Sequence, residues 1–231
     1  MIKAILMDWN GVVINDEQIQ CDAYREIFAE LHGIELTDED YYSRMGMNDR
    51  VFTASVLEAV GKAGDASTVA EIIEKKTVKW SEIVTENVPL FDGVDNFIHK
   101  CANEMALGIV SMAKREEIDL VLEKTGLGEC FSVIISAEDI STYKPDPTCY
   151  REGFRQIDLH RIAASHLPMN HGDCLVIEDS PAGVRAGKAA DLRVLGVANT
   201  VSSDKLKAAG ADAVATHLDD WMPETLRRVF V

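Results

Sequence analysis

The 231-residue sequence lacks most features of secreted, disulfide-bonded or membrane-inserted chains. Its five cysteines are an odd number, are widely spaced and form no C-x-x-C pair, which argues against a disulfide framework and a zinc site. The apolar stretch Met1–Met7 is interrupted by Lys3 and is too short to cross a bilayer. It also lacks the basic segment and cleavage site of a signal peptide. We therefore expect a soluble, cytoplasmic protein with no membrane partner.

Basic residues are scarce relative to acidic ones. The chain has 23 lysines and arginines against 39 aspartates and glutamates, which gives a formal net charge of −16. Such a chain would repel nucleic acid over most of its surface, so we expect no nucleic-acid partner. A small phosphorylated ligand would also be repelled, unless a bound cation and local positive groups offset the charge. The charge therefore mildly favours a metal at any phosphate site, although solubility alone also explains it.

Short apolar runs recur along the chain, with helix-like segments such as Lys114–Thr125 and Thr148–Gln156 between them. The runs are mostly continuous rather than alternating, which is typical of strands buried on both faces of a parallel sheet. This alternation of strand and helix predicts a doubly wound, Rossmann-like α/β fold. The predicted strands are Ile2–Met7, Ala106–Ser111, Val133–Ser136, Leu175–Ile177, Val194–Val197 and Ala213–Ala215.

The segment between the first two predicted strands is far longer than a simple crossover needs. It contains no convincing strand, and Thr37, followed by three acidic residues, indicates the start of a helix there. Its amphipathic helical stretches are Glu17–His32, Asp49–Gly61 and Thr68–Val84. We therefore predict an α-helical cap domain at residues 15–87, inserted into an α/β core formed by residues 1–14 and 88–231.

Polar residues follow several of the predicted strands. Asp8 follows the first, Ser111 ends the second, and Glu178 and Asp179 follow the fourth, while Lys144 lies after the third. In an open α/β sheet, ligands bind at the carboxyl ends of the strands, so we expect these side chains to converge. Carboxylates can hold Mg²⁺ and one of them can form an aspartyl-phosphate. The lysine and serine can hold the remaining phosphoryl oxygens, so the set favours phosphoryl transfer.

The motifs that carry these residues resemble those of the haloacid dehalogenase-like (HAD-like) hydrolase superfamily. The similarity is to the branch of β-phosphoglucomutase and the small sugar-phosphate phosphatases, which carries a helical cap. The matching motifs are Asp8–Val13, the strand end at Ser111, Lys144–Pro145 and Ile177–Gly183. They occur in the family's order and span essentially the whole chain. The resemblance implies a magnesium-dependent phosphatase that acts on a small phosphorylated metabolite, such as a sugar phosphate, through an aspartyl-phosphate intermediate.

The resemblance also implies a catalytic and metal-binding role for individual positions. Asp8 would be the nucleophile and a metal ligand. The backbone carbonyl of Asn10 and the side chain of Asp179 would be further ligands of Mg²⁺, with Glu178 nearby as a ligand or a water-mediated neighbour. The residues that the resemblance assigns to substrate binding are Ser111, Met112, Lys144 and Arg50.

The choice between a mutase and a phosphatase depends on the predicted cap. In the β-phosphoglucomutase pattern, a basic residue follows the Gly46 loop to hold a second phosphate, and a histidine lies on the first cap helix. This sequence has Asp49, one residue before Arg50, and Gln20 at the aligned positions. The resemblance therefore favours a hydrolase, with a phosphosugar mutase as the alternative in which Arg50 substitutes after a one-residue shift.

One position departs from the family's pattern. Where phosphatases and mutases of the family carry an aspartate as general acid and base, this chain has Asn10, whose carboxamide does not titrate. Such acid–base help is worth about 10²–10⁴ in rate. We consider three hypotheses: an engineered Asp→Asn substitution, a natural variant that uses a good leaving group or a proton donor from the cap, and a phosphate-ligand-binding homologue with little or no turnover.

Two other activities of the superfamily fit the sequence less well. Asp8-Trp9 and Met45–Met47 also resemble phosphonoacetaldehyde hydrolase, but the Schiff-base lysine expected next is replaced by residues 48–50. Without an imine-forming amine, cleavage of a carbon–phosphorus bond lacks its electron sink. Dehalogenation needs no metal, whereas Glu178-Asp179 resembles a metal site. Hydrolysis of a phosphomonoester is therefore the predicted reaction.

Overall fold

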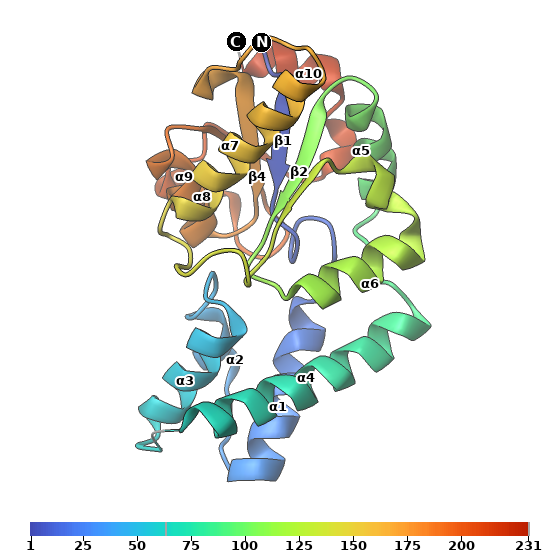
Figure 1. Cartoon of the computed structure of the whole chain (residues 1–231). Coiled ribbons are helices and arrows are strands. Elements are labelled where there is room, and N and C mark those ends of the chain that lie inside the picture. The colour runs from blue at the N-terminus through green and yellow to red at the C-terminus, as the bar shows by residue number, and fades with distance from the viewer. Residues whose placement is uncertain (63, 231) are drawn as a thin grey trace.

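The computed structural model describes residues 1–62 and 64–230, so Ala63 of the predicted cap and Val231 of the predicted core lie outside the described residues. Six parallel strands form one sheet in the order β3-β2-β1-β4-β5-β6 (Figure 1). The strands are β1 (Ala4–Met7), β2 (Ala106–Val110), β3 (Val133–Ile135), β4 (Cys174–Glu178), β5 (Arg193–Val197) and β6 (Ala213–Ala215). This topology confirms the predicted doubly wound α/β fold.

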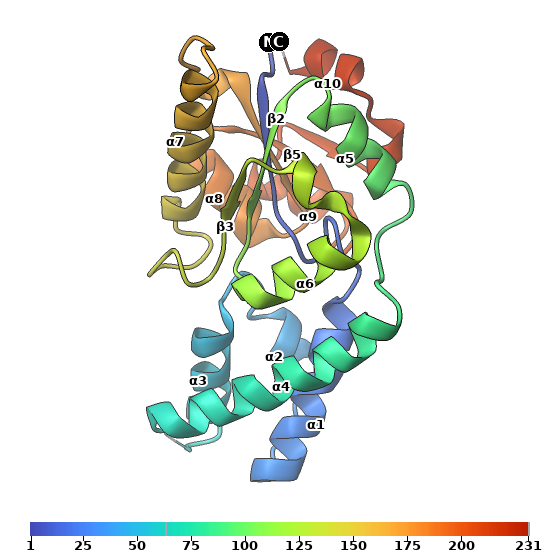
Figure 2. The ribbon, with the colours of Figure 1, turned by 45° about the vertical axis from the view of Figure 1, so that its right-hand side comes forward.

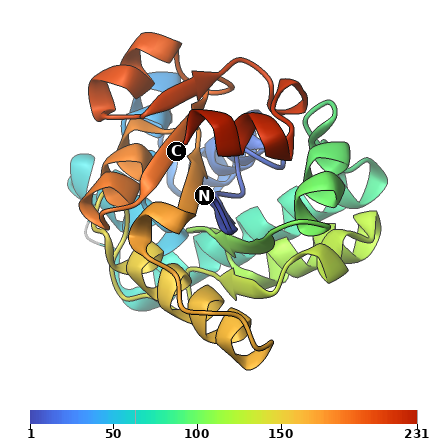
Figure 3. The same ribbon diagram turned by 90° about the horizontal axis from the view of Figure 1, so that it is seen from above.

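Helices cover both faces of the sheet, which Figure 3 shows from above. One face is covered by α5 (Val94–Ala102), α6 (Arg115–Thr125) and α10 (Pro223–Val229), and the other by α7 (Thr148–Ala163), α8 (Pro181–Ala189) and α9 (Ser203–Ala209). In β1, Ile5 and Met7 pack into the first layer, and Ala4 and Leu6 pack into the second. Burial on both faces explains why the strands read as continuous apolar runs. No helix within the described residues is long and apolar enough to span a membrane.

Within the described residues, four of the five helices between β1 and β2 lie beyond the carboxyl ends of the strands (Figures 1 and 2). They are α1 (Glu17–His32), α2 (Asp38–Tyr42), α3 (Asp49–Ala59) and α4 (Ala66–Glu86), and we call them the helical insertion. They bury an apolar cluster of their own, which includes Phe28, Phe52 and Ile72. The predicted start of a helix at Thr37 is confirmed, because its hydroxyl accepts a hydrogen bond from the amide of Asp40 at 3.1 Å.

The two connections between the sheet and the helical insertion run side by side. The amide of Asn15 donates to the carbonyl of Pro89 at 2.7 Å, and the amide of Phe91 donates to the carbonyl of Val13 at 3.2 Å. The carboxyl-terminal part of α4 also packs against the core, because α4 contacts α6 and Trp80 belongs to the core's apolar cluster. The helical insertion is therefore tied to the sheet edge at both of its ends.

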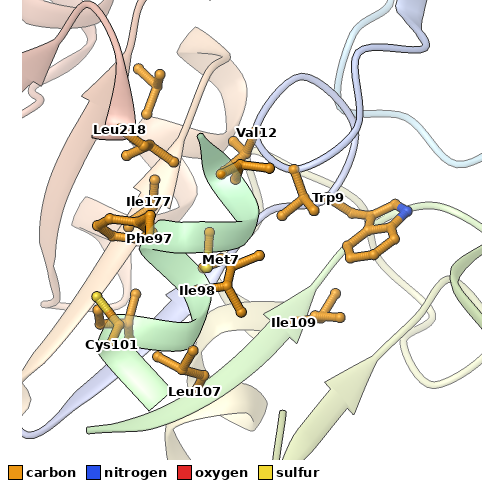
Figure 4. Close-up of a cluster of buried hydrophobic side chains, with 14 of the residues drawn as sticks. Met7, Trp9, Val12, Phe97, Ile98, Cys101, Leu107, Ile109, Ile177 and Leu218 are labelled. Atoms are coloured by element: carbon orange, nitrogen blue, oxygen red, sulfur yellow. The ribbon is translucent and has the colours of Figure 1, made fainter. Parts of the chain in front are cut away.

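The apolar core lies directly beneath the carboxyl end of β1 (Figure 4). Met7 and Ile177 from the central strands pack with Phe97 of α5, and Trp9 extends the same cluster past the end of β1. All four side chains are at most 1% exposed. Burying a large apolar side chain contributes about 1.5–3 kcal/mol, so Trp9 anchors the backbone on one side of Asp8.

Candidate active site

The carboxyl ends of β1 and β4 bring three carboxylates together. Met7 lies opposite Ile177 in the sheet register, so Asp8 and Glu178 reach the same sheet edge, and Asp179 follows. One carboxylate oxygen from each of the three acids lies within 4.8 Å of the others. Their residues are 9%, 0% and 1% exposed. The structure thus places together the three acids that the strand-end argument predicted.

A tight turn after β1 fixes Asp8 against Asp179. The amide of Trp9 donates to Asp8 Oδ1 at 2.8 Å, and the carbonyl of Trp9 accepts from the amide of Val13 at 2.8 Å. Gly11 has φ of 77°, and a Cβ there would lie 2.0 Å from Asp179 Oδ2. Only glycine fits this position, because it combines a positive φ with an approach that leaves no room for a side chain.

Lys144 is the basic partner of this cluster. It is 2% exposed, and its Nζ lies 2.9 Å from Asp8 Oδ1 and 2.6 Å from Glu178 Oε1. Burial alone would lower the pKa of Lys144, but the carboxylates of Asp8 and Glu178 raise it above its usual value. The side chain therefore remains an ammonium beside Asp8, where it can bind phosphoryl oxygens.

Glu178 is held by hydrogen bonds to both of its oxygens. Its Oε1 accepts from Lys144 and from the Tyr150 hydroxyl at 2.7 Å, and its Oε2 accepts from the amide and hydroxyl of Ser180. Gly183 leaves the space that the carboxylate fills, since a Cβ there would lie 1.7 Å from Oε1. Glu178 thus orients Lys144, and its predicted role as a direct metal ligand, which stays a prediction, would require one of these bonds to be exchanged.

The acidic cluster carries more negative charge than Lys144 offsets. Burial, followed by the nearby Glu178, raises the pKa of Asp8 to about 7, and Lys144 opposes the rise. Burial and the charges of Glu178 and Asp8 also raise the pKa of Asp179 well above its ordinary value, against a hydrogen bond from the Thr200 hydroxyl. A divalent cation would relieve this repulsion, so the donor set is one that hard metal ions prefer.

A pocket opens between this sheet edge and the helical insertion. Three residues assigned to substrate or phosphoryl binding, Ser111, Met112 and Lys144, lie in its wall together with Asp8. Ser111 is 1% exposed and its hydroxyl accepts from the amide of Ala113, which holds it at the end of β2. The structure therefore brings the predicted phosphoryl-binding residues to the mouth of the acidic cluster.

Arg50, the fourth predicted substrate-binding residue, is exposed and does not line the pocket. The preceding residue, Asp49, is in the wall instead, because the first turn of α3 directs consecutive side chains to different sides. The basic residue that the helical insertion contributes is Arg44, whose Nε donates to the Ser55 hydroxyl at 3.0 Å. Arg44 lies outside every motif of the resemblance, so nothing in the sequence pattern indicated its place in the pocket wall.

A second buried lysine joins the helical insertion to the core at the far wall of the pocket. Lys76 of α4 is fully buried, and its Nζ lies 2.7 Å from Asp49 of α3 and 2.8 Å from Glu117 of α6. It also donates to Gln20 of α1 at 3.1 Å. Gln20, Asp49 and Glu117 all line the pocket. This wall is therefore polar and rich in carboxylates.

The side chain of Asn10 is held by Asp16, at the amino end of α1. Asn10 Nδ2 donates to both oxygens of Asp16, at 2.9 and 3.0 Å. Asp16 is fully buried and also accepts from Trp80 Nε1 at 2.7 Å and from Gln20 Nε2 at 3.0 Å. Neither Asp16 nor the adjacent Glu17, which lines the pocket, is among the site residues predicted from the sequence. The signal was available as two adjacent acids just after the Asp8–Val13 motif.

Comparison with known proteins supports the family resemblance over most of the chain. The family model described as haloacid dehalogenase-like hydrolase matches residues 5–197. A phosphorylated carbohydrates phosphatase from Thermotoga maritima is 26% identical over 216 residues, which cover 92% of this chain and 94% of that protein. The Arabidopsis thaliana protein SUPPRESSOR OF QUENCHING 1, chloroplastic, is 32% identical over 218 residues. That match covers 92% of this chain, which spans only 19% of the much longer plant protein.

Solved structures share the fold at lower sequence identity. β-Phosphoglucomutase from Clostridium difficile superposes with a TM-score of 0.84 at 21% identity, covering 100% of this chain and 97% of that one. The likeness extends over the sheet and the helical insertion alike. This similarity shows a common fold.

Proposed function

Since this chain belongs to the haloacid dehalogenase-like hydrolases, we propose that it is a Mg²⁺-dependent phosphatase of a small phosphorylated carbohydrate. The observation that carries the proposal is the 2.9 Å contact between Lys144 Nζ and Asp8 Oδ1 in the wall of the pocket. A carboxylate there can attack phosphorus, and the adjacent ammonium can bind the phosphoryl oxygens. The relative named for phosphorylated carbohydrates supports the substrate class.

The residues around Asp8 fit Mg²⁺. Asp8 and Asp179 offer oxygen ligands at a buried site whose negative charge the Lys144 ammonium only partly offsets. We propose that these two side chains and the backbone carbonyl of Asn10 hold the ion, with Glu178 behind them. When bound, Mg²⁺ neutralises charge on the phosphoryl oxygens and keeps Asp8 ionised.

The remaining residues of the pocket have separate tasks in this reaction. Asp8 attacks the phosphorus atom, the sugar alcohol departs, and water then releases phosphate from the aspartyl-phosphate. Lys144 and the Ser111 hydroxyl hold the oxygens of the phosphoryl group during both steps. The helical insertion acts as a cap that covers the pocket and excludes bulk water.

The far wall of the pocket favours a phosphatase over a phosphosugar mutase. A mutase with a bisphosphate intermediate needs a second basic site away from Asp8. Within the described residues, the pocket wall has two basic side chains: Lys144, which lies beside Asp8, and Arg44, which is already paired with Asp40 and Ser55. The far wall presents Asp49 and Glu117. A second phosphate would meet like charge there, whereas sugar hydroxyls could donate to these carboxylates.

The test is to assay the purified chain on a panel of sugar phosphates and p-nitrophenyl phosphate, with Mg²⁺ and with EDTA. We expect release of phosphate that requires Mg²⁺ and is abolished by Asp8→Asn. The matched control is Asp204→Asn on the exposed surface of α9, which should keep full activity. Activity that survives Asp8→Asn would disprove the mechanism, and activity that is indifferent to EDTA would disprove the metal dependence.

The second candidate is a protein that binds a phosphorylated ligand without turning it over. Asn10 favours this candidate, because the family's acid–base position cannot titrate in this chain. Such a protein would bind sugar phosphates in a calorimeter in the presence of Mg²⁺ and would release no phosphate from any of them. Turnover of even one sugar phosphate with loss in Asp8→Asn excludes it.

A further inference from the structure

The inference that follows rests on the proposed phosphatase function and concerns the missing proton donor. Asn10 is matched to its surroundings, because its amide donates to both oxygens of the buried Asp16. A carboxylate at position 10 would place its oxygens against those of Asp16 at hydrogen-bonding distance, where two ionised groups repel each other. Trp80 and Gln20 already donate to Asp16 as well. The surroundings of position 10 therefore suit an asparagine better than an aspartate, which favours Asn10 as the natural residue over an engineered substitution.

Glu17 stands beside this pair, with access to the pocket that Asp8 faces. It is the first residue of α1, is half-buried and lines the pocket. The hydroxyl of Tyr41 donates to Glu17 Oε2 at 3.0 Å, which orients the carboxyl group and leaves Oε1 for a ligand. Its own helix supplies rigid support, since α1 packs along α4. Glu17 is thus a titratable group in the wall of the same pocket as Asp8.

The charges around Glu17 favour a protonated side chain near neutral pH. Burial is the largest cause that raises the pKa of Glu17, to about 8, and Asp16 and Asp8 add to the rise. The hydrogen bond from Tyr41 and the charge of Lys76 oppose it. The titratable groups that influence Glu17 or respond to its charge are Asp16 beside it, Cys21 of α1, Tyr41 and Tyr42 of α2, Lys76 of α4, and Asp8 and Asp179 at the sheet edge.

We propose that Glu17, in place of position 10, is the general acid and base of this enzyme. As Asp8 Oδ forms its bond to phosphorus, the bond between phosphorus and the sugar oxygen breaks, and the Glu17 proton passes to that oxygen. The Glu17 carboxylate then takes a proton from the water whose oxygen attacks the phosphorus of the aspartyl-phosphate. That second step frees inorganic phosphate, restores the Asp8 carboxylate and returns the proton to Glu17.

The deciding experiment compares leaving groups in a Glu17→Gln variant. Glucose 6-phosphate releases a strongly basic alkoxide that needs a proton, whereas p-nitrophenyl phosphate releases a stable anion that does not. We expect kcat for glucose 6-phosphate, or for the best sugar phosphate of the panel, to fall about 10²-fold or more, as is typical when a general acid is lost. With p-nitrophenyl phosphate, the initial burst of p-nitrophenol measures the rate constant of phosphoenzyme formation. We expect that rate constant to fall less than about 10-fold. Glu30→Gln, an exposed change on the same helix, should alter neither rate.

The outcomes separate this inference from the function on which it rests. Equal losses on the two substrates would show that Glu17 is only structural and would overturn the inference, while the phosphatase function would stand. If the unaltered chain turns over no substrate of the panel, the phosphatase function is disproved and, with it, any acid–base role of Glu17. Asn10→Asp should not raise kcat, because the new carboxylate faces Asp16. A gain of 10-fold or more in Asn10→Asp would also overturn the inference.

Discussion

Two buried lysines, Lys144 at the sheet edge and Lys76 in the helical insertion, have nearly the same surroundings. Each is at most 2% exposed and lies within 3.0 Å of two carboxylates. Each also lies over a tyrosine ring, with Nζ 5.2 Å from the centroid of Tyr150 and 5.4 Å from that of Tyr24. For both lysines, burial opposes the charge and the adjacent carboxylates raise the pKa above its usual value.

The difference lies in what the carboxylate partners do. Lys144 pairs with Asp8, which faces the pocket, so in the proposed reaction its ammonium would act on the phosphoryl group that binds there. Lys76 pairs with Asp49 of α3 and Glu117 of α6, so it links two parts of the chain. If the proposed mechanism holds, similar electrostatics serve catalysis at Lys144 and attachment at Lys76, so a perturbed pKa alone does not identify a catalytic residue.

The largest effect should follow Lys144→Met. Without the ammonium, the phosphoryl oxygens lose a charged donor, and loss of one such donor typically costs about 10²–10³ in kcat. Steady-state kinetics on the best substrate of the panel measure this loss. Lys76→Met is the matched control, because it removes an equally buried ammonium with two carboxylate partners and should change kcat less than about 10-fold. Equal losses of kcat in the two variants would break the distinction between the two lysines.

Lys76→Met should act on stability instead. Removing one partner of a buried ion pair leaves uncompensated charge on Asp49 and Glu117, which typically costs about 3–5 kcal/mol. Urea denaturation measures the loss as a lower free energy of unfolding. Adding Glu117→Leu to the same chain should recover most of it, since an apolar pair of similar volume replaces the ionic one. If the double variant is no more stable than Lys76→Met alone, Lys76 does not act through Glu117.

The sequence predicts the surroundings of Lys144 far better than those of Lys76. Asp8, Lys144 and Asp179 each follow an apolar run, and the rule that parallel strands present their carboxyl ends at one edge is enough to bring them together. Because the strands are buried on both faces, they appear in the sequence as continuous apolar runs. The predicted bounds of β6 match the structure, and the predicted start of β1 is two residues too early. These are consequences of local pattern and of one topological rule.

The surroundings of Lys76 depend on packing between helices, which no local sequence pattern encodes. Lys76 meets Glu117, 41 residues away, only because α4 crosses α6, and Trp80 meets Asp16 across 64 residues for a similar reason. In the sequence, Lys76 reads as one more charge on an amphipathic helix, and Glu117 as an acid in the first turn of another. The amphipathic pattern predicted the helices and left the pairing of their side chains undetermined.

The smallest effect concerns Glu17, whose pKa responds to Asp8 at the sheet edge and to Lys76 in the helical insertion. Within the described residues, it forms an ion pair with neither lysine. Its pKa is about 8 in the folded chain against 4.5 for an ordinary glutamate, so the folded state holds a proton that the unfolded state has released between these values. Stability should therefore fall as pH rises from about 4.5 to 8, and it should be unaffected by this group below that window.

Glu17→Gln removes the dependence, so the variant should gain about 1–2 kcal/mol over the unaltered chain between pH 5 and pH 8, after allowance for partial exposure. Urea midpoints at the two pH values in EDTA measure the gain, with Glu30→Gln as the flat control. A difference between Glu17→Gln and the unaltered chain that stays the same at both pH values would place Glu17 outside the influence of the acidic cluster.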